Sequence, residues 1–123
     1  METTPSITAV KTALTTLDPG AGHVTTINTY TVAPERAEEV LSYLVKSAVE
    51  TVRHVSGFVS FNFHLSLDGT RIINYGQWES REAVMAAREN PEIVALMAET
   101  VKIAGNSNSM PYVLRKSVPA AGK

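Results

Sequence analysis

Apolar residues recur at every second position in several stretches of the chain, which is the pattern of half-buried β-strands. The alternation is clearest over residues 58–67. In this stretch one side consists of Val59, Phe61, Phe63, Leu65 and Leu67, and the other of Ser60, Asn62, His64 and Ser66. Similar patterns predict further strands over residues 23–32, 71–79 and 112–118.

Helical spacing of apolar residues separates these strands. The first predicted helix begins at Pro34 and ends at Gly57, with an inward row made of Val40, Leu44, Ala48, Val52 and Val55. Ser80 and Asn90 suit the N-caps of two shorter helical segments, and Pro91 suits the first position of the second one. That second segment runs to Gly105 and is expected to point three apolar residues inward, namely Val94, Met97 and Val101.

The predicted order is strand, helix, strand, strand, helix, strand, which is the split βαβ order of ferredoxin-like domains. We therefore expect an α+β fold in which helices cover one face of an antiparallel sheet. Residues 23–118 form this domain, and residues 119–123 form a tail. Residues 1–22 end on a cluster of Asp, Pro and Gly and are expected to be a flexible arm. The alternative is that residues 7–17 dock as a short extra element.

Asp68-Gly69 predicts a two-residue hairpin turn between the second and third strands. A turn of this length pairs Leu65 with Ile72, Phe63 with Asn74, and Val59 with Trp78. The pairing places Asn74 on the face that the helices cover, where an unpaired amide would cost about 1–3 kcal/mol. Gly76 lies on the same face and is expected to leave a gap between Asn74 and Trp78.

Asn28 is the nearest candidate partner for Asn74, because the ferredoxin-like order places the first strand beside the third. In one interpretation the two amides satisfy each other in part, and no ligand is needed. In the other, they line a cavity with Tyr30, Phe63 and Trp78, and they form hydrogen bonds to a bound molecule. Asn74 and Trp78 are about 13 Å apart along a strand, a span that fits a flat fused-ring ligand.

The opposite face of the predicted sheet is half polar but too aromatic and aliphatic for simple exposure to water. It carries Ser60, Asn62, His64, Arg71, Ile73, Tyr75 and Gln77. A homodimer formed through these faces is expected to cover it. His64 is a tempting catalytic base, but the register directs it to this face. A three-residue turn would bring it opposite Asn74, so His64 stays a reserve candidate for the pocket.

Composition narrows the classes of partner. Apolar residues make up 44% and charged residues 19% of the chain, as in ordinary globular domains. A net charge of −1 offers no basic field for nucleic acid or an anionic membrane. The chain has no cysteine, and its histidines and carboxylates lack metal-ligand spacing. No apolar run approaches the roughly 18 residues that a membrane span requires, so we expect a cytoplasmic protein.

One motif carries a family likeness. Residues 64–80 read HLSLDGTRIINYGQWES, with TINTYTV before them and Pro34-Glu-Arg between. Residues 23–118 thereby resemble the antibiotic biosynthesis monooxygenase family, and most closely its actinorhodin-type branch. The resemblance implies a dimeric α+β barrel that oxidises a polycyclic aromatic, of the anthrone or quinol type, to a quinone. It also implies that molecular oxygen reacts without flavin, haem or metal.

The resemblance assigns the catalytic role to Asn74, Trp78 and Asn28. The expected substrate-binding residues are Tyr30, Phe63, Met85, Met97 and His64. Phe63 and Val84 stand where the actinorhodin-type members have tyrosines, and Met97 stands near the place of an arginine, so the expected pocket is more apolar than theirs. The alternative function is a non-catalytic dimeric barrel that binds a small aromatic ligand.

Overall fold

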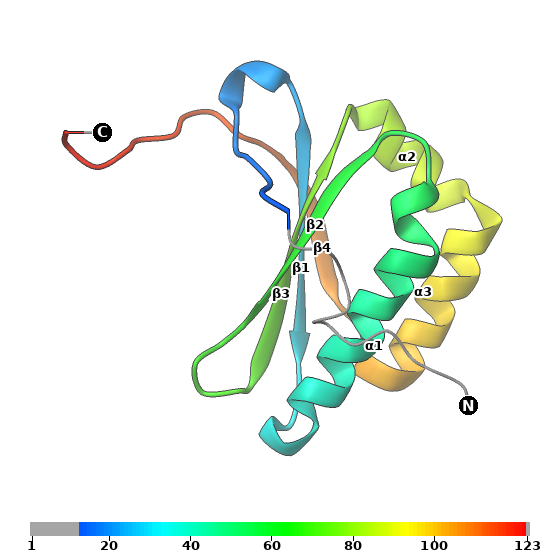
Figure 1. Cartoon of the computed structure of the whole chain (residues 1–123). Helices are drawn as coiled ribbons and strands as arrows, with labels where there is room; N and C mark the ends of the chain where they lie inside the picture. Colours follow the sequence, from blue (N-terminus) through cyan, green and yellow to red (C-terminus); the bar gives the residue numbers. More distant parts are fainter. Residues whose placement is uncertain (1–12, 123) are drawn as a thin grey trace.

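The structure is a computed structural model, and it describes residues 13–122 (Figure 1). The strands are β1 (Val24–Thr31), β2 (Phe58–Leu65), β3 (Arg71–Trp78) and β4 (Asn108–Val113). The α-helices are α1 (Ala37–Glu50), α2 (Arg81–Glu89) and α3 (Pro91–Ala104). Short 3-10 turns cover Pro19–Ala21, Pro34–Arg36 and Val52–His54.

The strands form one antiparallel sheet in the order β2-β3-β1-β4, which is the ferredoxin-like arrangement. All three helices lie against the same face of this sheet, here called the inner face (Figure 1). The sheet is open at β2 and β4. The predicted α+β fold with helices on one face is confirmed. The central position of β1 and β3 places their inward side chains beneath the helices.

The β2–β3 hairpin has the predicted register over most of its length. Leu65 pairs with Ile72, and Phe63 pairs with Asn74. The loop is longer than predicted, because the Ser66 N–H donates to the carbonyl of Arg71 and leaves residues 67–70 outside the ladder. A four-residue loop over residues 67–70 has the same centre as the predicted two-residue loop. The same residues of β2 and β3 therefore remain opposite each other, although the loop length was wrong. Leu67 is consequently fully exposed rather than on the inner face.

The start of β2 departs from the predicted register. Phe58, not Val59, pairs with Trp78, and a bulge lies between Phe58 and Ser60. A bulge inserts one extra residue into a strand, so the inward and outward positions change places across it. The predicted contact between Val59 and Trp78 is therefore wrong, and Phe58 takes that place on the inner face.

Other boundaries also differ from the predicted ones. The last strand covers residues 108–113 rather than 112–118, because β4 pairs with β1 from Asn108 opposite Thr29 to Val113 opposite Val24. Helix α1 stops at Glu50, and a 3-10 turn replaces its predicted last turns. The caps of α2 and α3 are as predicted, with Ser80 accepting from Ala83 N–H and Asn90 accepting from Glu92 N–H.

Helix α3 points two of the three expected residues inward. Val94 and Met97 line the space between the helices and the sheet, although they are 52% and 46% exposed. Val101 does not line this space and is 45% exposed. Thr100 and Ala104 are buried instead, and the hydroxyls of Thr100 and of Tyr43 on α1 lie 3.4 Å apart.

The core divides into two clusters along the length of the helices. One cluster contains Tyr30, Val40, Leu41, Leu44, Val45, Ile72 and Ala104. The other contains Val52, Trp78, Val84 and Ala87. The two clusters do not merge, and the space between them is where the candidate site lies.

Candidate active site

A cavity of about 610 Å³ lies between the inner face of the sheet and the helices. Its walls combine residues of both core clusters, such as Tyr30 and Leu44 from the first and Trp78 and Val84 from the second. Most of its surface is apolar. A volume of this size is typical of small-molecule sites, which lie within about 300–1,000 Å³.

Asn28 and Asn74 lie directly opposite each other on β1 and β3 and line this cavity. Asn74 is only 2% exposed. The Oδ1 atoms of both residues are buried and accept no hydrogen bond. The ligand-free interpretation requires the two amides to satisfy each other in part. They do not, because neither amide oxygen accepts a hydrogen bond. A buried acceptor without a donor costs about 1–3 kcal/mol, so the folded chain leaves hydrogen-bonding capacity unused at this pair.

Trp78 forms an apolar wall of the cavity. Its indole N–H is already used, because Nε1 donates to the Thr26 hydroxyl over 3.3 Å. Its ring packs edge-on against Phe58, with ring centres 5.5 Å apart, and against Phe61, with ring centres 6.1 Å apart. Both contacts have the perpendicular geometry that aromatic rings favour. The indole is held rigidly, and it presents apolar surface rather than a free donor.

The gap expected at Gly76 does not exist. A Cβ atom on Gly76 would lie 2.8 Å from both the Phe61 ring and the Thr26 hydroxyl, so these two side chains fill the space. The glycine permits this close packing beneath Trp78. The cavity lies instead above Asn28 and Asn74, towards the helices.

Tyr30 lines the cavity beside Asn28 and is 5% exposed. Burial raises the pKa of its phenol, a hydrogen bond with the Ser107 side chain opposes that change, and the nearby Tyr43 adds to it. A raised pKa keeps the phenol protonated at neutral pH. Tyr30 is therefore a hydrogen-bond donor in this site and a poor general base.

The structure brings most of the predicted site residues together. Asn28, Tyr30, Phe63, Asn74, Trp78 and Met97 all line the cavity. Met85 does not, because it lies on the outer side of α2 and is 52% exposed. His64 does not either, because it pairs with Ile73 on the face away from the helices and is exposed. The catalytic and substrate-binding roles remain predictions.

Several lining residues were missed in the sequence. Thr26 lies two positions before Asn28 on the same side of β1, so the strand period could have found it. Arg88 lies four residues after Val84, so helical spacing could have placed both on one face of α2. Ser107, Asn108 and Ser109 also line the cavity, and they lie between the predicted second helical segment and the predicted last strand.

Residues 13–122 contain no group of three or more His, Asp or Glu side chains placed to hold a metal ion. None of their helices combines the length and the apolar character needed to cross a membrane.

The fold and cavity define a small ferredoxin-like α+β protein with a small-molecule site between its sheet and its helices. Residues 23–99 match the model of the antibiotic biosynthesis monooxygenase family. The chain belongs to this family. It is 38% identical over 80 residues to tetracenomycin-F1 monooxygenase of Streptomyces glaucescens, a match that covers 65% of this chain and 71% of that relative.

Solved structures give the same assignment. A monooxygenase from the ActVA-Orf6 gene of Streptomyces coelicolor, in complex with nanaomycin D, is 25% identical. It superposes with a TM-score of 0.72 over 85% of this chain and 96% of that one. SnoaB of Streptomyces nogalater, a cofactor-independent oxygenase, is 22% identical and has a TM-score of 0.62 over 81% of this chain and 100% of that one, which shows a shared fold. The protein is a monooxygenase, and hence an oxidoreductase.

Proposed function

We propose that the protein oxidises a polycyclic aromatic of the anthrone or quinol type to a quinone, with molecular oxygen and without a cofactor. The observation that carries the proposal is the pair of buried, unpartnered amides of Asn28 and Asn74 beside an aromatic-lined cavity. The similarity to a monooxygenase named for tetracenomycin F1 supports the polycyclic substrate class.

The chemistry uses the substrate as its own source of electrons. Ground-state oxygen is a triplet, so it reacts with a closed-shell molecule through a one-electron step that needs an electron-rich partner. An anthrone becomes such a partner when its methylene carbon loses a proton and forms an enolate. One electron passes to oxygen, the two radicals join in a C–O bond, and loss of water leaves a carbonyl. One oxygen atom enters the quinone and the other leaves as water, so no external reductant is required.

Asn28 and Asn74 stabilise the enolate oxygen. Rotation of a carboxamide about its last side-chain torsion exchanges its oxygen and nitrogen, so either residue can direct N–H donors at a bound oxygen. Tyr30 adds a neutral O–H donor beside Asn28. Donors held in place before charge develops are typically worth 100-fold or more in rate. The proton leaves to water, because no strong base lines the cavity.

The rings of Trp78, Phe61 and Phe63 hold the flat substrate. These three side chains come from adjacent strands, and neighbouring rings contact each other edge to face. Fixed aromatic walls orient a planar molecule at little cost in side-chain entropy. They also keep the reacting carbon in an apolar environment, where hydrogen bonds to the enolate are stronger than in water.

The test is oxidation of a dihydroxyanthrone by the purified protein in air, with a chelator and no added flavin. We expect quinone absorbance to rise well above the buffer rate, with one oxygen molecule consumed per quinone. Trp78→Phe should slow the reaction by about tenfold, because the smaller ring orients the substrate less well. A rate equal to that of buffer, or one that Trp78→Phe leaves unchanged, would exclude this function for this class of substrate.

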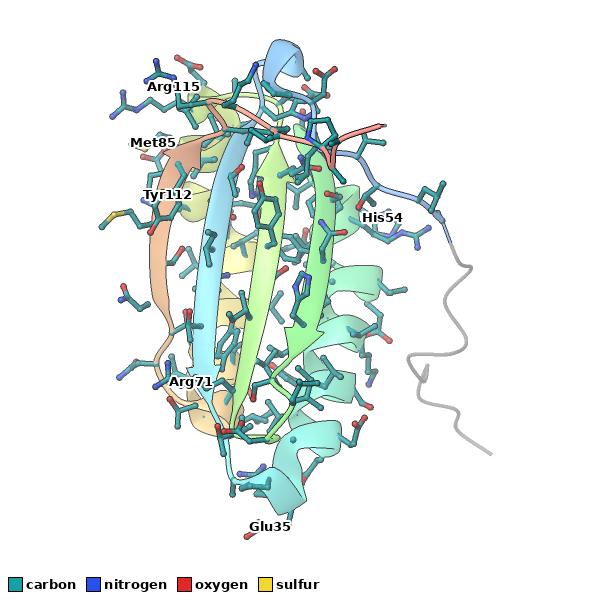
Figure 2. The ribbon with its side chains drawn as sticks, turned by 90° about the vertical axis from the view of Figure 1, so that its left-hand side faces the viewer. Glu35, His54, Arg71, Met85, Tyr112 and Arg115 are labelled. Atoms are coloured by element: carbon teal, nitrogen blue, oxygen red, sulfur yellow. The ribbon has the colours of Figure 1, made fainter. Side chains whose placement is uncertain are left out.

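We also propose that the protein forms a homodimer through the face of the sheet that lies away from the helices, here called the outer face. Figure 2 views this face, with Tyr112 on β4 and Arg71 at the start of β3. Ile73, Met110 and Tyr112 are 39%, 56% and 48% exposed there. Light scattering is expected to give the mass of two chains, and Tyr112→Lys is expected to shift it towards one. A monomeric mass for the unaltered protein would contradict the proposal.

A further inference from the structure

Arg88 is the single ionised side chain among the residues that line the cavity. The other lining groups are apolar, hydroxyl, amide or phenol side chains. A positive charge at the edge of an otherwise apolar site is costly to leave without an anion, unless it stays in water. Arg88 lines the cavity and is also exposed, so it lies where the cavity meets solvent.

The local structure of α2 directs Arg88 towards the cavity. Val84 and Ala87 are both 5% exposed and pack in the core cluster that contains Trp78. Arg88 lies one turn after Val84 and next to Ala87, so it leaves the helix on the same side. Met85 lies off this side and faces away from the cavity. The placement of Arg88 therefore follows from the packing of α2 on β3.

Arg88 has no carboxylate partner within the described residues. The two ion pairs in residues 13–122 join Arg36 to Glu39 and Lys102 to Glu99. A guanidinium offers several N–H donors in a planar fork that matches a carboxylate. It is therefore available to a ligand, and its geometry selects an anionic oxygen group.

The polar groups differ between the two ends of the cavity. Arg88 lies at the end formed by α2 and Trp78, whereas Tyr30 and Ser107 lie at the end formed by the other core cluster. Asn28 and Asn74 occupy the floor between them. A substrate that satisfies all three regions carries an anionic group on one terminal ring and neutral oxygens on its central and distal rings.

We infer that Arg88 selects a polycyclic substrate that carries a ring carboxylate, with this group bound at the α2 end of the cavity. The inference rests on the proposed function and narrows its substrate class. Arg88 acts at a ring remote from the reacting carbon, so it contributes to binding more than to the chemical step. Its partial exposure limits the contribution, because water and salt screen the pair.

The test compares two stable dihydroxyanthraquinones, one with a ring carboxylate and one with a methyl group at the same carbon. Binding is followed by the fluorescence of the single tryptophan, Trp78, so it does not depend on turnover. We expect a preference of about fivefold to tenfold for the carboxylate. Arg88→Met should abolish the preference, Arg88→Lys should keep part of it, and added salt should weaken it. Arg81→Met, on the exposed start of the same helix and outside the cavity, should change nothing.

Turnover of the corresponding anthrones separates the two proposals. Arg88→Met should raise KM for the carboxylated anthrone by about the same factor and leave kcat within about twofold. Equal binding of the two quinones, or a preference that survives in Arg88→Met, would overturn the role of Arg88. Absence of oxidation while the Arg88-dependent preference remains would overturn the proposed reaction and leave the binding inference standing.

Discussion

Both faces of the sheet carry amide side chains with buried atoms, but these amides differ in their hydrogen bonds. On the outer face, Asn62 donates to Ser60 and to the carbonyl of Tyr75, and its own oxygen accepts from Thr15. On the inner face, the amide oxygens of Asn28 and Asn74 accept nothing. A buried amide by itself is therefore no indication of a binding site. The feature that distinguishes the inner face is a buried amide oxygen without a hydrogen-bond donor.

The outer face obtains its partners partly from the segment before β1. Gln77 is 3% exposed, accepts from the Ser60 hydroxyl and donates to the backbone carbonyl of Thr16. Residues 13–17 thus lie along this face (Figure 1). The part of the predicted arm at residues 1–12 lies outside the described residues. The outer-face amides thus form hydrogen bonds within the chain, whereas the amide oxygens of Asn28 and Asn74 on the inner face accept none.

The largest expected effect comes from Asn74→Leu. The change removes a donor to the enolate, so kcat for anthrone oxidation should fall about 100-fold or more. It also removes a buried polar group that has no partner, so the midpoint of thermal unfolding should stay the same or rise. Calorimetry and quinone absorbance measure the two quantities. A large loss of stability would mean that Asn74 is a structural residue, as Asn62 is.

The matched change on the outer face is Gln77→Leu. It removes the acceptor of the buried Ser60 O–H and the donor to the Thr16 carbonyl, which should cost about 2 kcal/mol in the free energy of unfolding. Activity should remain within about twofold, because Gln77 lies on the face opposite the cavity. Chemical denaturation measures the cost. If activity fell as far as in Asn74→Leu, the division of the two faces would be wrong.

A smaller effect is expected for Thr26→Val, which removes a satisfied polar contact near the inner amides. The hydroxyl accepts from the Trp78 indole, and valine keeps its volume without the acceptor. The unpaired N–H should cost about 1 kcal/mol in stability. The emission of Trp78 should shift as its environment becomes less polar. Thr29→Val, on the outer side of the same strand, is the control and should leave the emission unchanged.

The smallest effect concerns the hairpin loop that assigns residues to the two faces. Hydrogen bonds from Thr70 and then Ser66 lower the pKa of Asp68 from 3.8 to about 2. The charged form is favoured in the folded state, so the stabilisation is present above about pH 4 and is lost as the pH falls towards 2. Asp68→Asn should therefore lower the unfolding temperature slightly at neutral pH. Melting curves of the two proteins should converge near pH 2, and a constant difference would contradict this account.

The sequence was sufficient for the middle of the inner face because its signals there are local. Alternation in β2 and a loop centred on Asp68-Gly69 predict the pair of Phe63 and Asn74 that β2 and β3 form. The cavity and the unpartnered state of Asn28 could not be read from the sequence. They depend on how far the helices stand from the sheet, which is a property of the whole packing.

Several errors arise where the packing of whole elements overrides a local pattern. On α3, Thr100 is buried where the helix meets α1, whereas Val101 is exposed. Strand β4 contains polar residues such as Asn108 because it lies at a sheet edge, where its pattern is weak. Arg88 is exposed, as is usual for an arginine on a helix, and only the packing of α2 shows that it also lines the cavity.

The bulge between Phe58 and Ser60 determines which aromatic side chains of β2 reach the wall of the site. A regular ladder that kept Val59 would pair Val59 with Trp78 and turn Phe58 outward, which would remove one of the two rings that pack against the indole. The irregular step in the ladder is thus the means by which two aromatic rings, three residues apart, reach the same side of one strand. A perfectly regular hairpin could not build this wall from the same residues.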